Sequence, residues 1–327
     1  MKLHRIAILD DYQRCVRSLE AYRLMDAHDV AHFHAPFTDE EAIVQSLKDF
    51  DAVVVLRERT ALPAHVLERL PALKLISAAG AFPSVVDLAA CKALGIAAVQ
   101  SAGFGAPTAE LCWALVLASR RHLLLEAEGL RAGLWQRHLG RQLQGQQLGI
   151  WGYGRVGRQV ARYGQAFGMK VSVWGSERAR QEAQADGMES AASRAALFQE
   201  SDVLTLHLKL VDATRGVVTV DDLNRMKEDA LLVNTSRAEL IAPGALAAAL
   251  ARGRPGFAAL DVFESEPVNA DSEPLLRLPN VLATPHIGFT ERSNYEAYYR
   301  QAFSHLLRFE AGETSDFLCH PASSQPA

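Results

Sequence analysis

Short apolar runs and helical patterns alternate in two successive series, and this alternation restricts the fold more than any other feature of the sequence. The first series lies in residues 1–103, with the runs HRIAILD, DAVVVL, LKLISA and IAAVQ. The second lies in residues 104–288, with QLGIW, KVSVW, DVLTLHL, ALLVNTS, FAALDVF and NVLATPHIG. Strands separated by helices at this spacing are typical of parallel sheets covered by helices. We therefore predict an α/β protein with two doubly wound parallel-sheet domains.

The two series are separated by SAGFGAP, Ser101 to Pro107, whose small and helix-breaking residues are typical of a hinge. After Gly288 comes a last amphipathic helical pattern, ERSNYEAYYRQAFSHLLRF. The simplest use of this helix is to cross back and pack on the first domain. We therefore predict one domain from residues 1–103 together with 289–327 and a second from 104–288. The polar tail HPASSQPA is expected to fray.

Composition favours a protein that acts on small molecules. The 327 residues, 49% hydrophobic and 22% charged, suffice for two domains of ordinary size. The net charge is −4 and the pI about 6.3. Positive charge is scattered along the chain, so neither nucleic acid nor an anionic membrane surface is expected as a partner.

Cysteine spacing and the longest apolar stretch indicate the cellular compartment in which the protein is expected. The four cysteines show neither metal-ligand nor CxxC spacing, which predicts no metal site and free thiols in a reducing compartment, the cytoplasm. The stretch LCWALVLASRRHLLL is broken by Arg120, Arg121 and His122. We therefore expect neither a membrane span nor a signal peptide.

A glycine-rich turn follows the first strand of the second series. Gly152, Gly154 and Gly157 form GxGxxG directly after QQLGIW and directly before a helical pattern. Glycines permit a tight turn and close backbone approach, and the N-terminus of the helix offers N–H groups and a positive dipole to a pyrophosphate. The context predicts a dinucleotide site. Because Rossmann methyltransferases also carry glycines here, the motif leaves the chemistry open.

The next strand, MKVSVW, ends where an acid would ordinarily hydrogen-bond the adenosine ribose. That position is Gly175, which lies 175 − 157 = 18 residues after Gly157 and has no side chain to do so. Without an acid there, repulsion against the 2′-phosphate of NADP is also missing. The sequence therefore leaves both NAD and NADP open as the cofactor.

Charged residues beside Gly175 act in opposite directions. Ser176 with Arg178, or Arg155 in the glycine turn, could supply hydrogen-bond donors to a 2′-phosphate. Glu177 could instead repel the phosphate or replace the missing acid. On these physical grounds NADP acceptance is slightly favoured over an exclusive use of NAD.

Three polar signals follow strands of the second series, at the sheet edge where open α/β proteins bind ligands. LLVNTSRAEL places Arg237 just after one strand. ALDVFESEP places Asp261 at the end of another, with Glu266 a few residues later. VLATPHIGF places His286 directly after Pro285, which stiffens the backbone. An arginine, a glutamate and a histidine that converge beside a nicotinamide site predict an oxidoreductase.

Reduction of a 2-oxo acid accounts for all three residue types. A guanidinium such as that of Arg237 offers planar paired donors that fix a carboxylate and polarise the ketone. The imidazole of His286 can give a proton to the nascent alkoxide, or take one in the oxidative direction. A carboxylate beside the ring, that of Glu266, would hold it and favour the imidazolium.

The chain resembles the D-isomer-specific 2-hydroxyacid dehydrogenases through GYGRVGRQVA, LLVNTSRAEL, LDVFESEP and TPHIGF, in that order. The resemblance implies a Rossmann nucleotide-binding domain inserted into a flavodoxin-like substrate-binding domain. It also implies a cleft that joins the two and a homodimer formed through the Rossmann domains. The catalytic Arg, Glu and His of the family fall on Arg237, Glu266 and His286.

The resemblance also implies binding residues. Cofactor contacts are expected at Arg155, Val156, His207, Thr235, Ser236, Asp261 and Gly288, beside the glycine turn and the residues after it. The substrate carboxylate is expected to meet backbone N–H groups in AAGAFPS, at Ala79, Gly80 and Ala81. Arg57 or Arg59, in LRERT, would read a second anionic group on the substrate if it faced the cleft.

Other functions share these features. Formate dehydrogenases lack the acid partner of the histidine, so Glu266 argues against that activity. Phosphite oxidation uses a similar set of Arg, Glu and His, and phosphoglycerate is a further candidate substrate. Transcriptional corepressors share the fold and bind dinucleotide but act mainly as scaffolds.

Overall fold

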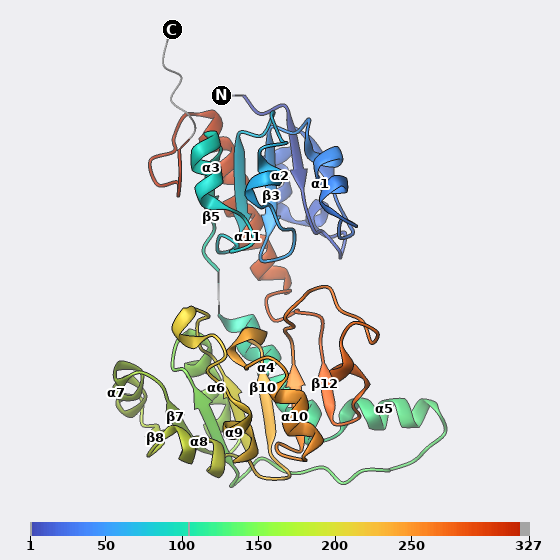
Figure 1. The fold of residues 1–327 in the computed structure, drawn as a ribbon, viewed down its shortest axis with the longest axis vertical. Coiled ribbons are helices and arrows are strands. Elements are labelled where there is room, and N and C mark those ends of the chain that lie inside the picture. The colour runs from blue at the N-terminus through green and yellow to red at the C-terminus, as the bar shows by residue number, and fades with distance from the viewer. Residues whose placement is uncertain (1, 104, 321–327) are drawn as a thin grey trace. The chain divides into compact units, whose positions relative to one another are not determined.

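The computed structural model describes residues 2–103 and 105–320 (Figure 1). The chain divides into two compact units, Met1–Phe104 with Glu291–Ala327, and Gly105–Thr290. The expected boundaries were after residues 103 and 288. Phe104 of the expected hinge and the tail from Pro321 lie outside the described residues. Each unit is built on one parallel sheet (Figure 1), which confirms the predicted fold class.

The first unit holds a five-stranded parallel sheet in the order β2-β1-β3-β4-β5. Its strands are β1 Arg5–Ile8, β2 Asp29–His32, β3 Ala52–Leu56, β4 Leu75–Ala79 and β5 Ala97–Gln100. β3 and β4 are buried along their whole length, because helices cover both faces of the sheet. β2 was not predicted from the sequence. It is a half-buried edge strand with little apolar signal.

Helices of the first unit come from both ends of the chain. They are η1 Val16–Ser18, η2 Glu20–Met25, α1 Glu40–Leu47, α2 Ala64–Leu67, α3 Leu88–Leu94 and α11 Arg292–Glu310. α11 packs on the sheet through the buried Tyr299 and Phe303, and its Ala302 carbonyl accepts a hydrogen bond from Ser77 of β4 at 3.0 Å. The last helix therefore completes the first unit.

The second unit holds a seven-stranded parallel sheet in the order β12-β11-β10-β9-β6-β7-β8. Its strands are β6 Gln147–Trp151, β7 Lys170–Trp174, β8 Glu189–Ser190, β9 Val203–Leu206, β10 Leu231–Asn234, β11 Phe257–Leu260 and β12 Val281–Ala283. β8 was not predicted, because two residues are too few to show a pattern. The order reverses at β6, which lies between β9 and β7, so a ligand crevice is expected at the carboxyl ends of these strands.

Helices connect the strands of the second sheet. They are α4 Ala106–Arg120, α5 Leu123–Arg131, α6 Arg155–Ala166, α7 Glu177–Ala185, α8 Arg194–Glu200, α9 Val220–Asn224 and α10 Ala245–Ala251, with the short turns η3 Asp212–Thr214, η4 Ala238–Leu240 and η5 Pro274–Arg277. Within the described ranges, no helix has the length and apolar character needed to cross a membrane. The same residues contain no cluster of His, Cys, Asp and Glu able to hold a metal ion.

Candidate active site

The glycine turn lies at the carboxyl end of β6, where the strand order reverses. Gly152 has φ of 102°, and a Cβ there would lie 2.7 Å from the carbonyl oxygen of His207. A Cβ at Gly157 would overlap the Gly152 carbonyl. α6 begins at Arg155, and no side chain of the described residues caps its Gly154 N-terminus. Its first N–H groups and its dipole are therefore available to an anion.

A pocket of about 540 Å³ opens beside the glycine turn. Gly152 and Gly154 line it together with Gly175, which follows β7. The glycine cradle, the helix N-terminus and the adjoining pocket fit a dinucleotide. Other residues that line the pocket include Trp151, Tyr153, Ser176, Arg178, Ala179, Glu182, His207, Leu208, Lys209, Thr214 and Val217.

His207, which follows β9, lies at the wall of this pocket. Its Nε2 atom is buried and has no hydrogen-bond partner among the described residues. Burial lowers the pKa of His207 to about 4, so the ring is neutral at pH 7. A buried polar atom at the pocket wall is suited to meet a polar group of a bound ligand.

The residues that follow Gly175 in sequence differ in their contacts and in whether they line the pocket. Ser176 accepts a hydrogen bond from the Ala179 N–H at 3.3 Å as the N-cap of α7. Arg178 lines the pocket, whereas Glu177 accepts a hydrogen bond from Gln181 at 3.3 Å and is not among the described residues that line it. The acid that does line the pocket is Glu182, which sequence reasoning missed.

Arg237 follows β10 in a loop that is closed by the side chain of Asn234. The Asn234 Nδ2 group donates to the Arg237 carbonyl at 2.9 Å, and its Oδ1 accepts from the Ser236 N–H at 3.0 Å. Asn234 is fully buried. Arg237 donates from Nη1 to the Ser236 carbonyl at 2.8 Å. Asn234 therefore fixes the backbone that carries Arg237, and only its position at the end of an apolar strand could have indicated this from sequence.

His286 and Glu266 form a hydrogen-bonded pair. Nδ1 of His286 lies 2.6 Å from Oε2 of Glu266, and Oε1 of Glu266 accepts from the Phe263 N–H at 3.0 Å. The side chains are 14% and 23% exposed, so both are largely shielded while the pair stays accessible. His286 has φ of 50°, an uncommon left-handed conformation for a residue other than glycine.

Asp261, at the end of β11, fastens the loop that carries His286. Its Oδ1 accepts from Thr284 Oγ1 at 2.6 Å and from the Ile287 N–H at 2.8 Å. Its Oδ2 accepts from the Gly288 N–H at 2.8 Å. Burial raises the pKa of Asp261, while these hydrogen bonds and His286 act against the rise. Asp261 thus holds the Thr284 side chain before His286 and the backbone after it, in addition to the cofactor contact expected for Asp261.

The three loops follow neighbouring strands, because β10, β11 and β12 are adjacent in the sheet. The carboxyl ends of parallel strands lie at one edge, so the loops of Arg237, Glu266 and His286 share that edge. An imidazole that is hydrogen-bonded to a carboxylate can hold or release a proton at its other nitrogen. A guanidinium on the adjoining loop can bind a carboxylate.

In the first unit, Arg57 lies against the expected substrate loop. Gly80 has φ of 114°, and a Cβ there would lie 3.1 Å from Cδ of Arg57 and 3.6 Å from the ring of Tyr298. Arg57 has φ of 56° and a side chain that is 18% exposed. Ala79 ends β4 and is buried, whereas Ala81 is exposed. The structure therefore brings Arg57, the loop and Tyr298 of α11 together, and Tyr298 was missed from sequence.

Arg59 is held differently from Arg57. Its guanidinium stacks 4.6 Å above the ring of Tyr12, whose hydroxyl donates to Asp10 at 2.9 Å. Thr60 also donates to Asp10, at 3.0 Å. These contacts fix Arg59 over the loop after β1, whereas Arg57 lies against Gly80.

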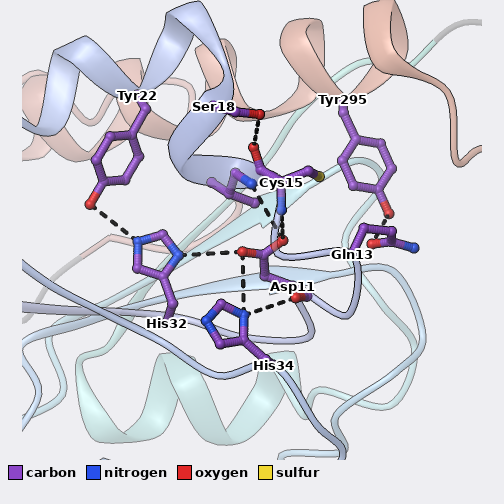
Figure 2. A network of polar contacts seen from close by, with 9 residues as sticks. Asp11, Gln13, Cys15, Ser18, Tyr22, His32, His34 and Tyr295 are labelled. Atoms are coloured by element: carbon purple, nitrogen blue, oxygen red, sulfur yellow. Dashed lines mark hydrogen bonds and ion pairs between the residues drawn. The ribbon is translucent and has the colours of Figure 1, made fainter.

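The loop after β1 is fastened by a polar network around Asp11 (Figure 2). Its carboxylate accepts from the Cys15 N–H at 2.9 Å and lies 3.5 Å from Nδ1 of both His32 and His34. His32 is in turn hydrogen-bonded to Tyr22 at 3.1 Å. Burial opposes ionisation of Asp11, but the hydrogen bonds outweigh it and lower its pKa. The network ties the ends of β1 and β2 to η1 and η2.

Comparisons with known proteins agree with this architecture. Residues 113–288 match the family model described as "D-isomer specific 2-hydroxyacid dehydrogenase, NAD binding domain". A glyoxylate reductase of Aeropyrum pernix is 34% identical over 84% of this chain and 84% of its own length. A hydroxypyruvate reductase of Thermotoga maritima is 32% identical over 82% of this chain and 88% of its own.

Among solved structures, a phosphoglycerate oxidoreductase of Vibrio cholerae O395 superposes with a TM-score of 0.92. It is 46% identical, and the match covers 94% of this chain and 99% of that one. The likeness therefore spans both units and both sheets. On these matches the chain belongs to the D-isomer specific 2-hydroxyacid dehydrogenases, and it is an NAD-dependent oxidoreductase that acts on a CH–OH group.

Proposed function

We propose that the protein interconverts a 2-oxo acid and a D-2-hydroxy acid with Arg237, Glu266 and His286 as its catalytic residues. The observation that carries this proposal is the hydrogen bond of 2.6 Å between His286 Nδ1 and Glu266 Oε2. With Nδ1 held by the carboxylate, Nε2 is the ring atom that exchanges a proton with the substrate oxygen. When bound, NADH would supply the hydride for reduction, and NAD⁺ would accept it in the reverse direction.

Each residue then has one task. Arg237 binds the substrate carboxylate and polarises the ketone through its paired donors. His286 gives its Nε2 proton to the oxygen as the ketone is reduced and recovers it in the reverse direction. Glu266 keeps the ring oriented and stabilises its positive charge. Asn234 and Asp261 keep the two loops in place through the contacts described above.

On the cofactor side, the glycine turn and the N-terminus of α6 would hold the pyrophosphate, with Arg155 and Val156 in the first turn of the helix. His207 would meet the cofactor from the pocket wall. By resemblance, Thr235, Ser236, Asp261 and Gly288 would lie toward the nicotinamide. NADP acceptance depends on the groups beside Gly175, where Ser176 and Arg178 are candidate donors to a 2′-phosphate.

In the first unit, we propose that the backbone of Ala79, Gly80 and Ala81 binds the substrate carboxylate and that Arg57 reads a second anionic group. The packing of Arg57 against Gly80 supports this. So does the phosphoglycerate oxidoreductase name of the Vibrio cholerae relative, because that name implies a phosphorylated substrate. The substrate class is then a small 2-oxo acid that carries a phosphate or a second carboxylate.

Arg57→Ala tests this assignment. We expect kcat/KM for a phosphorylated or dicarboxylic 2-oxo acid to fall by about 10²-fold, the cost of losing one charged hydrogen-bonding partner, while kcat/KM for glyoxylate falls much less. Arg59→Ala is the matched control, because the Arg59 guanidinium stacks on Tyr12 instead. Equal ratios of the two substrates in Arg57→Ala and in the parent would contradict the assignment.

A scaffold function of the corepressor kind is the alternative from another class. It predicts tight dinucleotide binding with no turnover, whereas the proposed function predicts oxidation of NADH in the presence of a 2-oxo acid. A steady-state assay separates these functions when the parent is given NADH with glyoxylate, hydroxypyruvate or pyruvate, and NAD⁺ with phosphite or formate. Turnover of phosphite or formate alone would replace the proposed reaction with one of those oxidations.

We further propose that the protein is a homodimer formed through the second unit. α5 and the segment after it expose several large apolar side chains. Exposed apolar side chains gathered in one region of the chain favour burial of that region against a partner. A second copy of the chain is the partner that the family resemblance implies. The exposed side chains are Leu123, Leu124, Leu125, Leu130, Leu134, Trp135 and Leu139.

Substitution of the two most exposed of these residues tests the dimer. Trp135 and Leu139 are 75% and 95% exposed. We expect the Trp135→Ser/Leu139→Ser variant to sediment as a monomer and the parent to sediment as a dimer. Leu94→Ser, at an exposed apolar residue of α3 in the first unit, should leave the dimer intact. A parent that sediments as a monomer at micromolar concentration would refute the proposal.

A further inference from the structure

We propose that Glu182 of α7 is the acid that recognises the adenosine ribose and makes the protein prefer NAD to NADP. This inference rests on the proposed function, since it concerns the cofactor of the same reaction. An acid that binds the adenosine ribose ordinarily stands at the end of the strand, a position that is Gly175 here. Glu182 lies seven residues further along the chain (182 − 175 = 7).

The position of Glu182 in the pocket is the first observation. β7 ends at Trp174, and Gly175 offers no side chain to a ribose. Glu182 lines the same pocket as Gly175, Ser176 and Arg178. Its side chain is 35% exposed, so the carboxylate can meet a ligand. An ionised carboxylate there accepts hydrogen bonds from ribose hydroxyls and repels a 2′-phosphate.

The contacts of Glu182 are the second observation. Its Oε1 accepts from Nε of Arg178 at 2.7 Å, and its Oε2 accepts from Nη2 of Arg158 at 3.1 Å. The hydrogen bond from Arg178 is the main cause that lowers the pKa of Glu182, which keeps the carboxylate ionised at neutral pH. Arg178, the candidate donor to a 2′-phosphate, is therefore engaged by Glu182.

The glycine turn and Glu182 are joined by a network that fixes their separation. Arg158 of α6 also lies 3.1 Å from Asp186, which accepts a hydrogen bond from the Tyr153 hydroxyl at 3.0 Å. Tyr153 is the residue between Gly152 and Gly154, and the Arg158 guanidinium stacks 5.3 Å from its ring. The ion pair between Arg158 and Asp186 does not involve Glu182, so these contacts should survive a substitution at Glu182.

Glu177 is the acid nearest to Gly175 in sequence, and it is the competing candidate. It lies in the first turn of α7 and accepts a hydrogen bond from Gln181 along the helix. Of the two acids, only Glu182 is among the described residues that line the pocket. Glu177 therefore provides a matched control, because it carries the same charge on the same helix.

Isothermal titration with NADH and with NADPH tests the inference without relying on turnover. We expect the parent to bind NADH more tightly than NADPH. In Glu182→Gln, the affinity for NADPH relative to NADH should rise by about tenfold, because one like charge is removed and Arg178 is released to the phosphate. Adding Arg178→Ala to Glu182→Gln should cancel most of this gain. Glu177→Gln should change the ratio by less than about threefold, since its charge lies outside the pocket.

The outcomes separate the two proposals. An unchanged NADPH to NADH ratio in Glu182→Gln, with NADH still bound and the melting temperature of the parent retained, would overturn the role of Glu182 alone. A larger change in Glu177→Gln than in Glu182→Gln would assign the role to Glu177 and overturn this inference. Failure of the parent to bind either dinucleotide would overturn the proposed function and this inference with it.

Discussion

Replacing His286 with asparagine is expected to lower kcat for reduction of a 2-oxo acid by about 10²–10⁴-fold, the usual contribution of a general acid. Asparagine is the informative choice because it tolerates a left-handed backbone, and His286 has φ of 50°. The loop should therefore keep its conformation while the proton donor is lost. Affinity for NADH, measured by titration, should stay within about twofold of the parent, because the ring acts on the substrate.

Glu266→Gln tests the pair rather than the ring alone. Glutamine has the same size and can still accept the hydrogen bond from the Phe263 N–H, but it carries no charge to favour the imidazolium. We expect a smaller loss of kcat than in His286→Asn, because the general acid itself is retained. A kcat in His286→Asn within about threefold of the parent value would show that another group supplies the proton.

The second large effect is expected at Arg237. Arg237→Ala should lower kcat/KM for every 2-oxo acid by about 10²–10³-fold or more, because the substrate carboxylate loses its charged, paired donors. Arg237→Lys keeps the charge but not the planar pair of donors, so it should recover only part of the loss. Steady-state kinetics at saturating NADH measure both variants.

The structure offers a control for Arg237 that separates binding from loop geometry. The Asn234 side chain donates to the Arg237 carbonyl, and Ser236 donates from its Oγ to the Leu208 carbonyl at 2.7 Å. Ser236→Ala removes that tie without touching the guanidinium, so its effect should be much smaller than that of Arg237→Ala. Similar losses in Ser236→Ala and Arg237→Ala would mean that the arginine acts through the fold of the loop.

The two sheets could be predicted because parallel strands that helices cover on both faces read as apolar runs. β3 and β10 are examples, buried along their whole length. β2 and β8 could not be predicted, since one is a half-buried edge strand and the other has two residues. Their pairing depends on neighbouring strands that no local pattern reveals.

For the candidate site, sequence placed Arg237, Glu266 and His286 after buried strands, and the structure shows a direct contact between the last two. The hydrogen bonds that hold the loops of these residues in place could not be predicted. Asn234 and Asp261 act through hydrogen bonds to loop backbone, and such bonds depend on turn geometry and rotamers rather than on spacing. The left-handed conformation of His286 was equally invisible.

Glu182, the acid that lines the pocket beside the glycine turn, could not be found from the sequence either. Counting from the glycine turn led to Gly175 and then to Glu177, because sequence proximity was the only measure of distance. Glu182 lies on α7 one turn beyond Arg178, and the helical period brings residues four apart to the same face. The structure was needed to show that this face lines the pocket.

The fate of the hydride tests the central claim most directly. The parent protein is incubated with NADH that carries deuterium at the transferring position and with pyruvate or hydroxypyruvate, and the product is resolved by chiral chromatography and mass spectrometry. We predict one deuterium at C2 of the D-2-hydroxy acid for each NADH consumed. The L-enantiomer, a product without deuterium at C2, or tight NADH binding with no product from any 2-oxo acid would contradict the account.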